Sequence, residues 1–209
     1  AGQGPVAPGG DTRSARGRIL AASLAAATLA RLGPQVHAQA PKVLKISHQF
    51  PGGTIDEGDF RDRMLRKFAA EVEKRTNGQL KFEIYPGGSL VKPVEQWGAM
   101  ANGSLDLSLY PLAYAGGRVP ELNIGLMPAL VTSYEQGLRW KDAPIGKELT
   151  RIVEEKGVKI ITWVWQAGGI ASRAKPVISP DDVKGLKFRG GSKEMDVMLK
   201  AAGASPTNV

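Results

Sequence analysis

The residues best suited to bind an anion follow a short predicted strand near the end of the sequence. Residues 186–188 alternate apolar and polar side chains, as a half-buried strand does. Arg189 comes next, then Gly190 and Gly191, and Ser192 is a good cap for the helix predicted after it. A guanidinium and a helix N-terminus both favour a carboxylate or phosphate, and two glycines leave room for one. The sequence therefore predicts an anion site at Arg189, with an ordinary surface arginine as the alternative.

Three further places are candidates for the lining of a binding cleft. His48 follows the first predicted strand, at the edge where open α/β folds bind ligands. It is either a hydrogen-bond donor in a pocket or a structural or exposed imidazole. Tyr110 ends the third predicted strand and is either a cleft wall or a core residue. Gly168 and Gly169 follow another predicted strand, where they fit a tight turn or a close backbone approach.

The sequence lacks the patterns of most enzymes and cofactor-binding proteins. It has no cysteine, which excludes disulfides, thiol nucleophiles and cysteine-bound metals. His48 is the one histidine after residue 40, and no carboxylates have the spacing that a zinc site would need. Nucleophile-elbow, Gly-x-Gly-x-x-Gly and Walker A motifs are absent, and no basic run contains interleaved aromatic residues. We therefore predict no catalytic residue, metal, cofactor or nucleic-acid partner.

Residues 1–40 have the layout of a secretory signal peptide preceded by extra sequence. Arginines at positions 13, 16 and 18 precede the apolar stretch Ile19–Ala30, and Ala38-Gln39-Ala40 is a small-x-small cleavage site. The stretch is shorter than the about 20 residues that span a bilayer, and an uncleaved amphipathic anchor is the alternative. We predict export and cleavage after Ala40. The net charge then falls from +8 to +5, because residues 1–40 hold four arginines and one aspartate.

Residues 43–109 alternate strand and helix patterns, which predicts a mostly parallel α/β sheet covered on both faces. Thr54 and Glu57 have the spacing of a capping box for the first helix, and Asn77-Gly78 ends that helix. The predicted elements are strands at 43–46, 80–85 and 105–109 and helices at about 60–76 and 91–101.

The next part of the chain is predicted to be helical and then extended. Ser133 and Gln136 are expected to cap a helical region that runs to about residue 155 and is split by Pro144. Residues 158–165 form a long, mostly apolar run, which predicts a strand. Its tryptophans, at positions 163 and 165, fit core residues better than cleft walls.

The end of the sequence has the features of an interrupted domain. Ser179, Pro180 and Gly185 predict one helical turn before the strand that leads to Arg189. Residues 166–209 are too few to bury a good core alone, and the final residues read as a loop that leads into another strand. We therefore expect the chain to be truncated at Val209.

Five segments of the sequence carry a resemblance to a known family: Tyr85–Leu90, Leu105–Leu107, Val119–Leu122, Pro180–Arg189 and Gly203–Pro206. In this order and spacing they resemble the solute-binding proteins of tripartite ATP-independent periplasmic (TRAP) transporters, the DctP family. The run from Pro180 to Arg189 is the most specific of them. The resemblance extends over nearly all of residues 41–209.

The resemblance implies a two-lobed α/β fold like that of periplasmic binding proteins, with the first lobe largely present and the second incomplete. It implies a first lobe at 41–165 and the start of a second at 166–209, after the leader 1–40. It also implies a non-enzymatic periplasmic protein that captures a small organic acid and delivers it to the TRAP membrane permease subunits.

The same resemblance implies roles for individual residues. Arg189 corresponds to the arginine that grips the ligand's carboxylate, and the loops at His48 and at Tyr110-Pro111 line the cleft. Gly168 stands in the region where many members have a second arginine, so a monocarboxylate is at least as apt a ligand as a diacid. Because the site is incomplete, we expect residues 41–209 alone to bind weakly or not at all.

Two other functions stay open from the sequence. An exported hydrolase on an α/β fold would need a nucleophile or a carboxylate pair with a perturbed pKa. A non-functional remnant of a truncated gene would be secreted without binding anything. Catalytic turnover would favour the first, and failure to fold cooperatively would favour the second.

Overall fold

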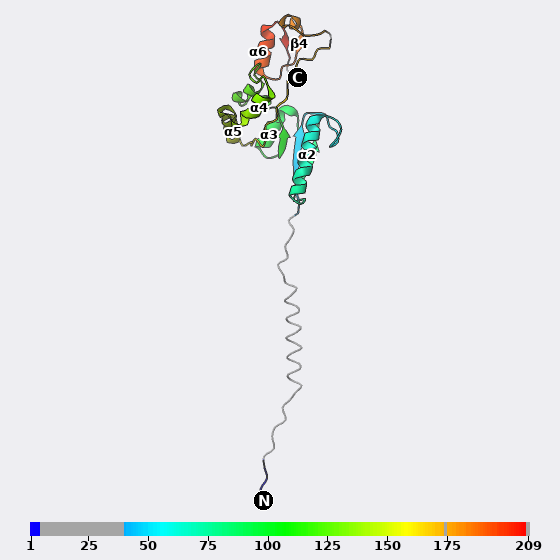
Figure 1. Cartoon of the computed structure of the whole chain (residues 1–209), viewed down its shortest axis with the longest axis vertical. Helices are drawn as coiled ribbons and strands as arrows, with labels where there is room; N and C mark the ends of the chain where they lie inside the picture. The colour runs from blue at the N-terminus through cyan, green and yellow to red at the C-terminus, as the bar shows by residue number, and fades with distance from the viewer. Residues whose placement is uncertain (5–39, 174, 208–209) are drawn as a thin grey trace. The chain divides into compact units, whose positions relative to one another are not determined.

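The computed structural model describes residues 1–4, 40–173 and 175–207 (Figure 1). The predicted signal peptide, at 13–40, lies almost wholly outside the described residues. Contacts gather the chain from Pro41 onward into one unit. The predicted lobe boundary at 165/166 falls within this unit and stays a prediction. In the ranges described, no helix is both long enough and apolar enough to cross a membrane.

The described elements, in chain order, are β1 (Lys42–His48), α2 (Phe60–Arg75), β2 (Leu80–Tyr85), α3 (Gln96–Ala101), β3 (Leu107–Leu109), α4 (Tyr134–Arg139), α5 (Pro144–Glu155), β4 (Lys187–Phe188), α6 (Lys193–Ala201) and β5 (Ser205–Pro206). Short 3₁₀ helices lie between them: η1 (Pro93–Glu95), η2 (Leu112–Ala115), η3 (Pro120–Leu126), η4 (Trp140–Asp142) and η5 (Pro180–Val183).

Strands β1, β2 and β3 form one parallel sheet in the order β2-β1-β3. Ile46 of β1 pairs with Ile84 of β2 and with Leu107 of β3. Parallel strands need crossover connections, and α2 and then η1 with α3 supply them. The carboxyl ends of the three strands, at His48, Tyr85 and Leu109, therefore share one edge. The predicted parallel α/β arrangement is confirmed.

Helix α2 begins later than its predicted capping box. Its cap is Asp59, whose carboxylate accepts the backbone N–H of Arg61 at 2.9 Å. Thr54 instead accepts the N–H of Glu57 at 3.0 Å and closes a separate turn. The capping prediction is wrong because Gly58, at a φ of +96°, reverses the chain between that turn and the helix. The predicted end at Asn77-Gly78 is confirmed.

Helix α3 and strand β3 are both shorter than predicted. Lys92 is extended because the residue before a proline avoids the helical region, so the chain before Pro93 is not helical. The buried side chain of Gln96 donates to the carbonyl of Val91 at 3.0 Å and fixes that bend. Strand β3 starts after Asp106, whose carboxylate accepts the N–H of Lys45 in place of a backbone carbonyl.

The main core lies beside the sheet and is built from the segments between α3 and α5. Its buried members are Trp97, Ala115, Val119, Leu122, Trp140, Leu149 and Val153. Complete burial of one such aliphatic side chain stabilises the fold by about 1.5–3 kcal/mol. The cluster fixes η2 and η3, the helices that follow the carboxyl end of β3.

The predicted strand at 158–165 is not present in the structure. These residues have no regular secondary structure, because no described residue forms a ladder with them. Trp163 and Trp165 nevertheless pack against the main core, with their rings 6.3 Å apart. The expectation that both tryptophans are core residues is confirmed only in part, because both are partly buried, and the expected strand is wrong.

The region from Ser179 onward agrees with its sequence pattern. The carboxylate of Asp182 accepts the N–H of Ser179 at 2.8 Å, and Gly185 has a φ of +74°. Ser192 caps α6 by accepting the N–H of Met195 at 3.3 Å. Strands β4 and β5 pair in parallel. These elements enclose a small core of their own, made by Val183, Leu199 and Ala204.

Candidate functional site

Arg189 lies at the end of β4, as predicted, and its side chain reaches η2. Its Nη2 donates a hydrogen bond to the hydroxyl of Tyr114 at 2.7 Å. The guanidinium carbon is 5.4 Å from the centre of the same ring. Arg189 remains exposed despite these contacts. Two segments 75 residues apart in the sequence therefore meet at one exposed cation.

Tyr110 lies behind this pair and belongs in part to the core. Its ring meets that of Tyr114 edge-on at 6.1 Å and that of Trp97 at 6.2 Å. The Tyr110 hydroxyl is buried and has no hydrogen-bond partner among the described residues. Burial raises the pKa of Tyr110 to about 12, so the phenol keeps its proton at neutral pH. Tyr110 thus packs against the main core, and its place in the wall of a cleft stays a prediction.

Tyr114 is a member of the site that sequence reasoning missed. Pro111 begins the segment, and its carbonyl accepts the N–H of Tyr114 at 2.9 Å. The resulting turn carries the tyrosine to Arg189. No local pattern marks Tyr114, because the contact that brings it to the site joins residues 75 positions apart.

The two glycines after Arg189 make room for other parts of the protein. A Cβ at Gly190 would overlap the carboxylate of Asp196 in α6. A Cβ at Gly191 would lie 3.3 Å from Leu126, at the end of η3. Close contacts with protein atoms therefore explain both glycines, and their role beside a ligand stays a prediction. These glycines therefore set the position of Arg189 relative to η3.

Gly168 and Gly169 lie in an exposed segment without regular structure. A Cβ at either position would meet no atom within 4 Å. The structure does not bring them into contact with the Arg189–Tyr114 pair. Their place in the site stays a prediction.

His48 is completely buried, so the structural role is the one that this geometry favours. Its Nε2 lies 3.0 Å from Oδ1 of Asp62, and its Nδ1 accepts the N–H of Phe50 at 3.2 Å. Burial lowers the pKa of His48, although Asp62 opposes this shift. Both ring nitrogens are engaged, which leaves none to activate a serine nucleophile. The geometry gives no support to a hydrolase built on this histidine.

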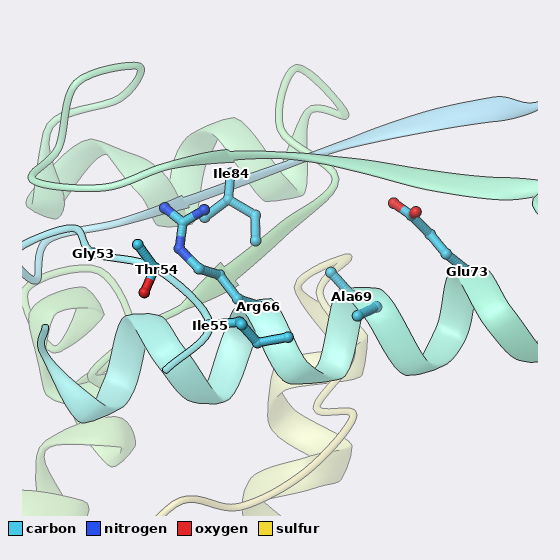
Figure 2. A pocket seen from close by; sticks show the side chains of 8 residues that line it. Gly53, Thr54, Ile55, Arg66, Ala69, Glu73 and Ile84 are labelled. Atoms are coloured by element: carbon cyan, nitrogen blue, oxygen red, sulfur yellow. The ribbon is translucent and has the colours of Figure 1, made fainter. Parts of the chain in front are cut away.

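A hollow between α2 and the edge strand β2 is a second candidate (Figure 2). Arg66 and Glu73 stand toward its two ends. Arg66 donates to Asp62 at 2.7 Å, and Glu73 accepts the N–H of Phe82 at 3.1 Å. Both charged side chains are therefore engaged in hydrogen bonds within the protein. Glu73 also satisfies the backbone N–H of Phe82 on the edge strand β2. In the described ranges, no group of three histidines or acids could hold a metal ion.

Comparisons with known proteins point to one family. The model of the bacterial extracellular solute-binding proteins, family 7 (DctP), matches residues 53–209. A solute-binding protein of Albidiferax ferrireducens is 67% identical over 162 residues, or 78% of this chain and 48% of that protein. The C4-dicarboxylate-binding periplasmic protein DctP of Rhodobacter capsulatus is 33% identical, covering 90% of this chain and 56% of its own length. The chain spans about half the length of these curated relatives.

A solved structure gives the same answer for the fold. A TRAP periplasmic solute-binding protein from Rhodoferax ferrireducens, crystallised with bound malonate, matches with a TM-score of 0.77 at 65% identity. The match covers 79% of this chain and 52% of that one. The predicted two-lobed fold, represented here by the first lobe and part of the second, is confirmed.

Proposed function

Because this chain belongs to the DctP family, family 7 of the bacterial extracellular solute-binding proteins, we propose that it captures a small carboxylate outside the cytoplasm. It then delivers the carboxylate to the membrane permease subunits of a TRAP transporter. Two lobes close around the ligand, and the ligand stabilises the closed arrangement. The function requires shape and hydrogen bonds rather than a catalytic residue.

The exposed guanidinium of Arg189 is the observation that carries this proposal. Tyr114 accepts one of its N–H groups, which leaves further donors for a ligand. The Tyr114 hydroxyl keeps its own proton to donate, and no described acid forms an ion pair with Arg189. This set of donors suits an oxyanion. An Arg–carboxylate hydrogen bond contributes about 1.5–3 kcal/mol.

The ligand class is a short-chain carboxylic acid. The 65% identical structure holds malonate, and a 33% identical relative is named for C4-dicarboxylates. Gly168 stands where the family resemblance would place a second arginine. We therefore propose that Arg189 anchors one carboxylate and that neutral groups receive the rest of the ligand, so a monocarboxylate also fits.

Calorimetric titration with malonate and propionate tests the site. In a version extended to the length of the relatives, Arg189→Ala should lower the affinity for the better ligand by about tenfold or more, because a charge-assisted hydrogen bond is lost. Arg189→Lys keeps the charge but loses the planar, two-pronged donor arrangement of the guanidinium. Its affinity should therefore lie between those of the parent protein and Arg189→Ala. An unchanged dissociation constant in Arg189→Ala would show that Arg189 does not bind the ligand.

Export to the periplasm is the second part of the proposal, and the processed terminus tests it. Cleavage after Ala40 would leave Pro41 as the first residue. We expect mass spectrometry of the protein from a periplasmic extract to find a chain that starts at Pro41. A chain that keeps residues 13–40 and stays with the cytoplasmic fraction would contradict export.

A further inference from the structure

A buried histidine and a buried aspartate fix the segment that follows β1. The side chains of His48 and Asp62 are both 0% exposed, and Nε2 lies 3.0 Å from Oδ1. The other oxygen of Asp62 accepts the N–H of Gly53 at 2.9 Å and the Nε–H of Arg66 at 2.7 Å. One carboxylate therefore joins the end of β1, the turn at Gly53 and the first turns of α2.

The hydrogen bonds fit only the neutral form of His48. Nδ1 faces the backbone N–H of Phe50, which is a donor, so Nδ1 must accept. The proton is then on Nε2, which donates to Asp62. A second proton on Nδ1 would set two donors against each other and break the contact with Phe50. The charged groups that face the ring are Asp62 and Asp59, which favour its protonation, and Arg66, which opposes it.

A continuous series of contacts runs from His48 to the exposed segment near Gln166. The ring of His48 stacks on that of Phe50 at 5.9 Å, and the guanidinium of Arg61 lies 3.8 Å from the centre of the Phe50 ring. Asp59 holds Arg61 through bonds of 2.8 and 2.6 Å. The free arm of Arg61 then donates to the side-chain oxygen of Gln166 at 3.3 Å.

Gln166 begins the stretch that leads from the main core toward η5. Its described residues have no regular secondary structure, so side-chain contacts must hold them in place. Within the described residues, Arg61 holds Gln166, and the hydroxyl of Tyr134 accepts the N–H of Ala167 at 3.3 Å. One of these two attachments depends on the segment that His48 fixes.

We propose that neutral His48 is a positioning residue: it holds Phe50 under Arg61, and Arg61 in turn holds Gln166. Protonation of His48 removes the acceptor for the Phe50 N–H, shifts the Phe50 ring and releases Gln166. The direction in which the chain leaves the main core is thereby coupled to one buried imidazole. This coupling goes beyond ligand capture and does not require a ligand.

Nuclear magnetic resonance of the whole chain tests the coupling. His37→Gln leaves His48 as the sole histidine, so every imidazole signal belongs to it. At pH 7 we expect the neutral ring with its proton on Nε2. As the pH falls, the amide signals of Phe50 and Gln166 should move with the same midpoint as the ring, below pH 6.5. The amide of Val153 in the main core should not move in that range.

Phe50→Leu supplies the matched variant, because it removes the aromatic bridge and keeps the His48–Asp62 pair. In this variant the imidazole of His48 should still titrate, whereas the amide signal of Gln166 should no longer shift with it. The proposal is overturned by a ring protonated on Nδ1 at pH 7, or by a titration at the ordinary 6.5. It is equally overturned if the amide signal of Gln166 does not shift with pH, or if the amide signal of Val153 shifts with the His48 titration. The same holds if the Gln166 amide still shifts with the His48 titration in Phe50→Leu.

Discussion

Two tyrosines four positions apart differ in what their hydroxyl groups bond to. Tyr114 accepts a hydrogen bond from Arg189 at 2.7 Å, on the exposed side of the cluster. The Tyr110 hydroxyl is buried without a partner. A buried polar group without a hydrogen bond costs about 1–3 kcal/mol, so the two hydroxyls have opposite effects on stability.

Removal of the Tyr114 hydroxyl should therefore weaken ligand binding, whereas removal of the Tyr110 hydroxyl should not weaken the fold. Tyr114→Phe takes away the acceptor that orients Arg189, and we expect ligand affinity to fall by roughly 2- to 10-fold, the equivalent of about 0.5–1.5 kcal/mol. Tyr110→Phe is the matched variant and should leave the free energy of unfolding unchanged or raise it. Urea unfolding and calorimetric titration measure both. A loss of stability in Tyr110→Phe would mean that its hydroxyl has a partner.

At the scale of elements, the parallel arrangement of the first three strands and the cap of α6 were predictable, whereas the cap of α2 and the fate of the apolar run at 158–165 were not. Ser192 caps α6 as its sequence position predicts, because a cap involves neighbours along the chain. The prediction that Thr54 caps α2 is wrong because Gly58 separates the turn that Thr54 closes from that helix. The apolar run at 158–165 looks like a strand, but a strand requires a partner, and the sequence names none.

The candidate site shows the same division. The position of Arg189 at the end of a strand was predictable because strand, glycines and helix cap are adjacent in the sequence. Tyr114 was missed because its bond to Arg189 spans 75 residues. The burial of His48 was equally hidden, since its partner Asp62 lies on α2 and only the packing of that helix on the sheet brings the two together.

Gly146, in the first turn of α5, offers a test of how η4 packs against that helix. A Cβ at Gly146 would overlap the backbone carbonyl of Trp140, which cannot turn away as a side chain can. We expect Gly146→Ala to lower the free energy of unfolding by about 1–3 kcal/mol, despite alanine's better helix propensity.

Gly117→Ala is the control for that substitution. Its Cβ would meet no atom within 4 Å, so stability should change by less than about 0.5 kcal/mol or rise slightly. Urea unfolding of both variants compares them directly. Equal stability of Gly146→Ala and the parent chain would contradict the packing of η4 against α5.

At the scale of the whole molecule, acid should destabilise the fold in two steps. Burial lowers the pKa of His48 below its usual 6.5, so the unfolded chain binds more protons and stability falls as the pH drops below 6.5. The hydrogen bonds from Arg61 lower the pKa of Asp59 from 3.8 to about 2, so its contribution is lost between those values. At pH 7 both contributions are complete.

Urea unfolding from pH 8 to pH 3 measures the first step and the beginning of the second. We expect the free energy of unfolding to be flat from pH 8 to 7 and to decline below pH 6.5. His48→Gln should flatten the decline between pH 6.5 and 5. A stability that does not change between pH 7 and 5 in the parent chain would contradict a buried neutral histidine.

The chain spans about half the length of its relatives, and the proposed site lies within the residues that match the family. The most direct measurement reports on Arg189 itself and detects weak as well as tight binding. Resonances of arginine Nε–H groups, followed during titration with malonate, meet this need. Arg189→Lys identifies the Arg189 signal by its disappearance.

We predict that malonate shifts the Arg189 signal more than that of any other arginine and that the shift saturates. In Arg189→Lys the remaining arginine signals should stay in place at the same malonate concentrations. A saturable shift at another arginine, with Arg189 unaffected, would show that the ligand binds elsewhere. No shift at any arginine up to tens of millimolar malonate would contradict the assignment of a carboxylate site to this part of the molecule.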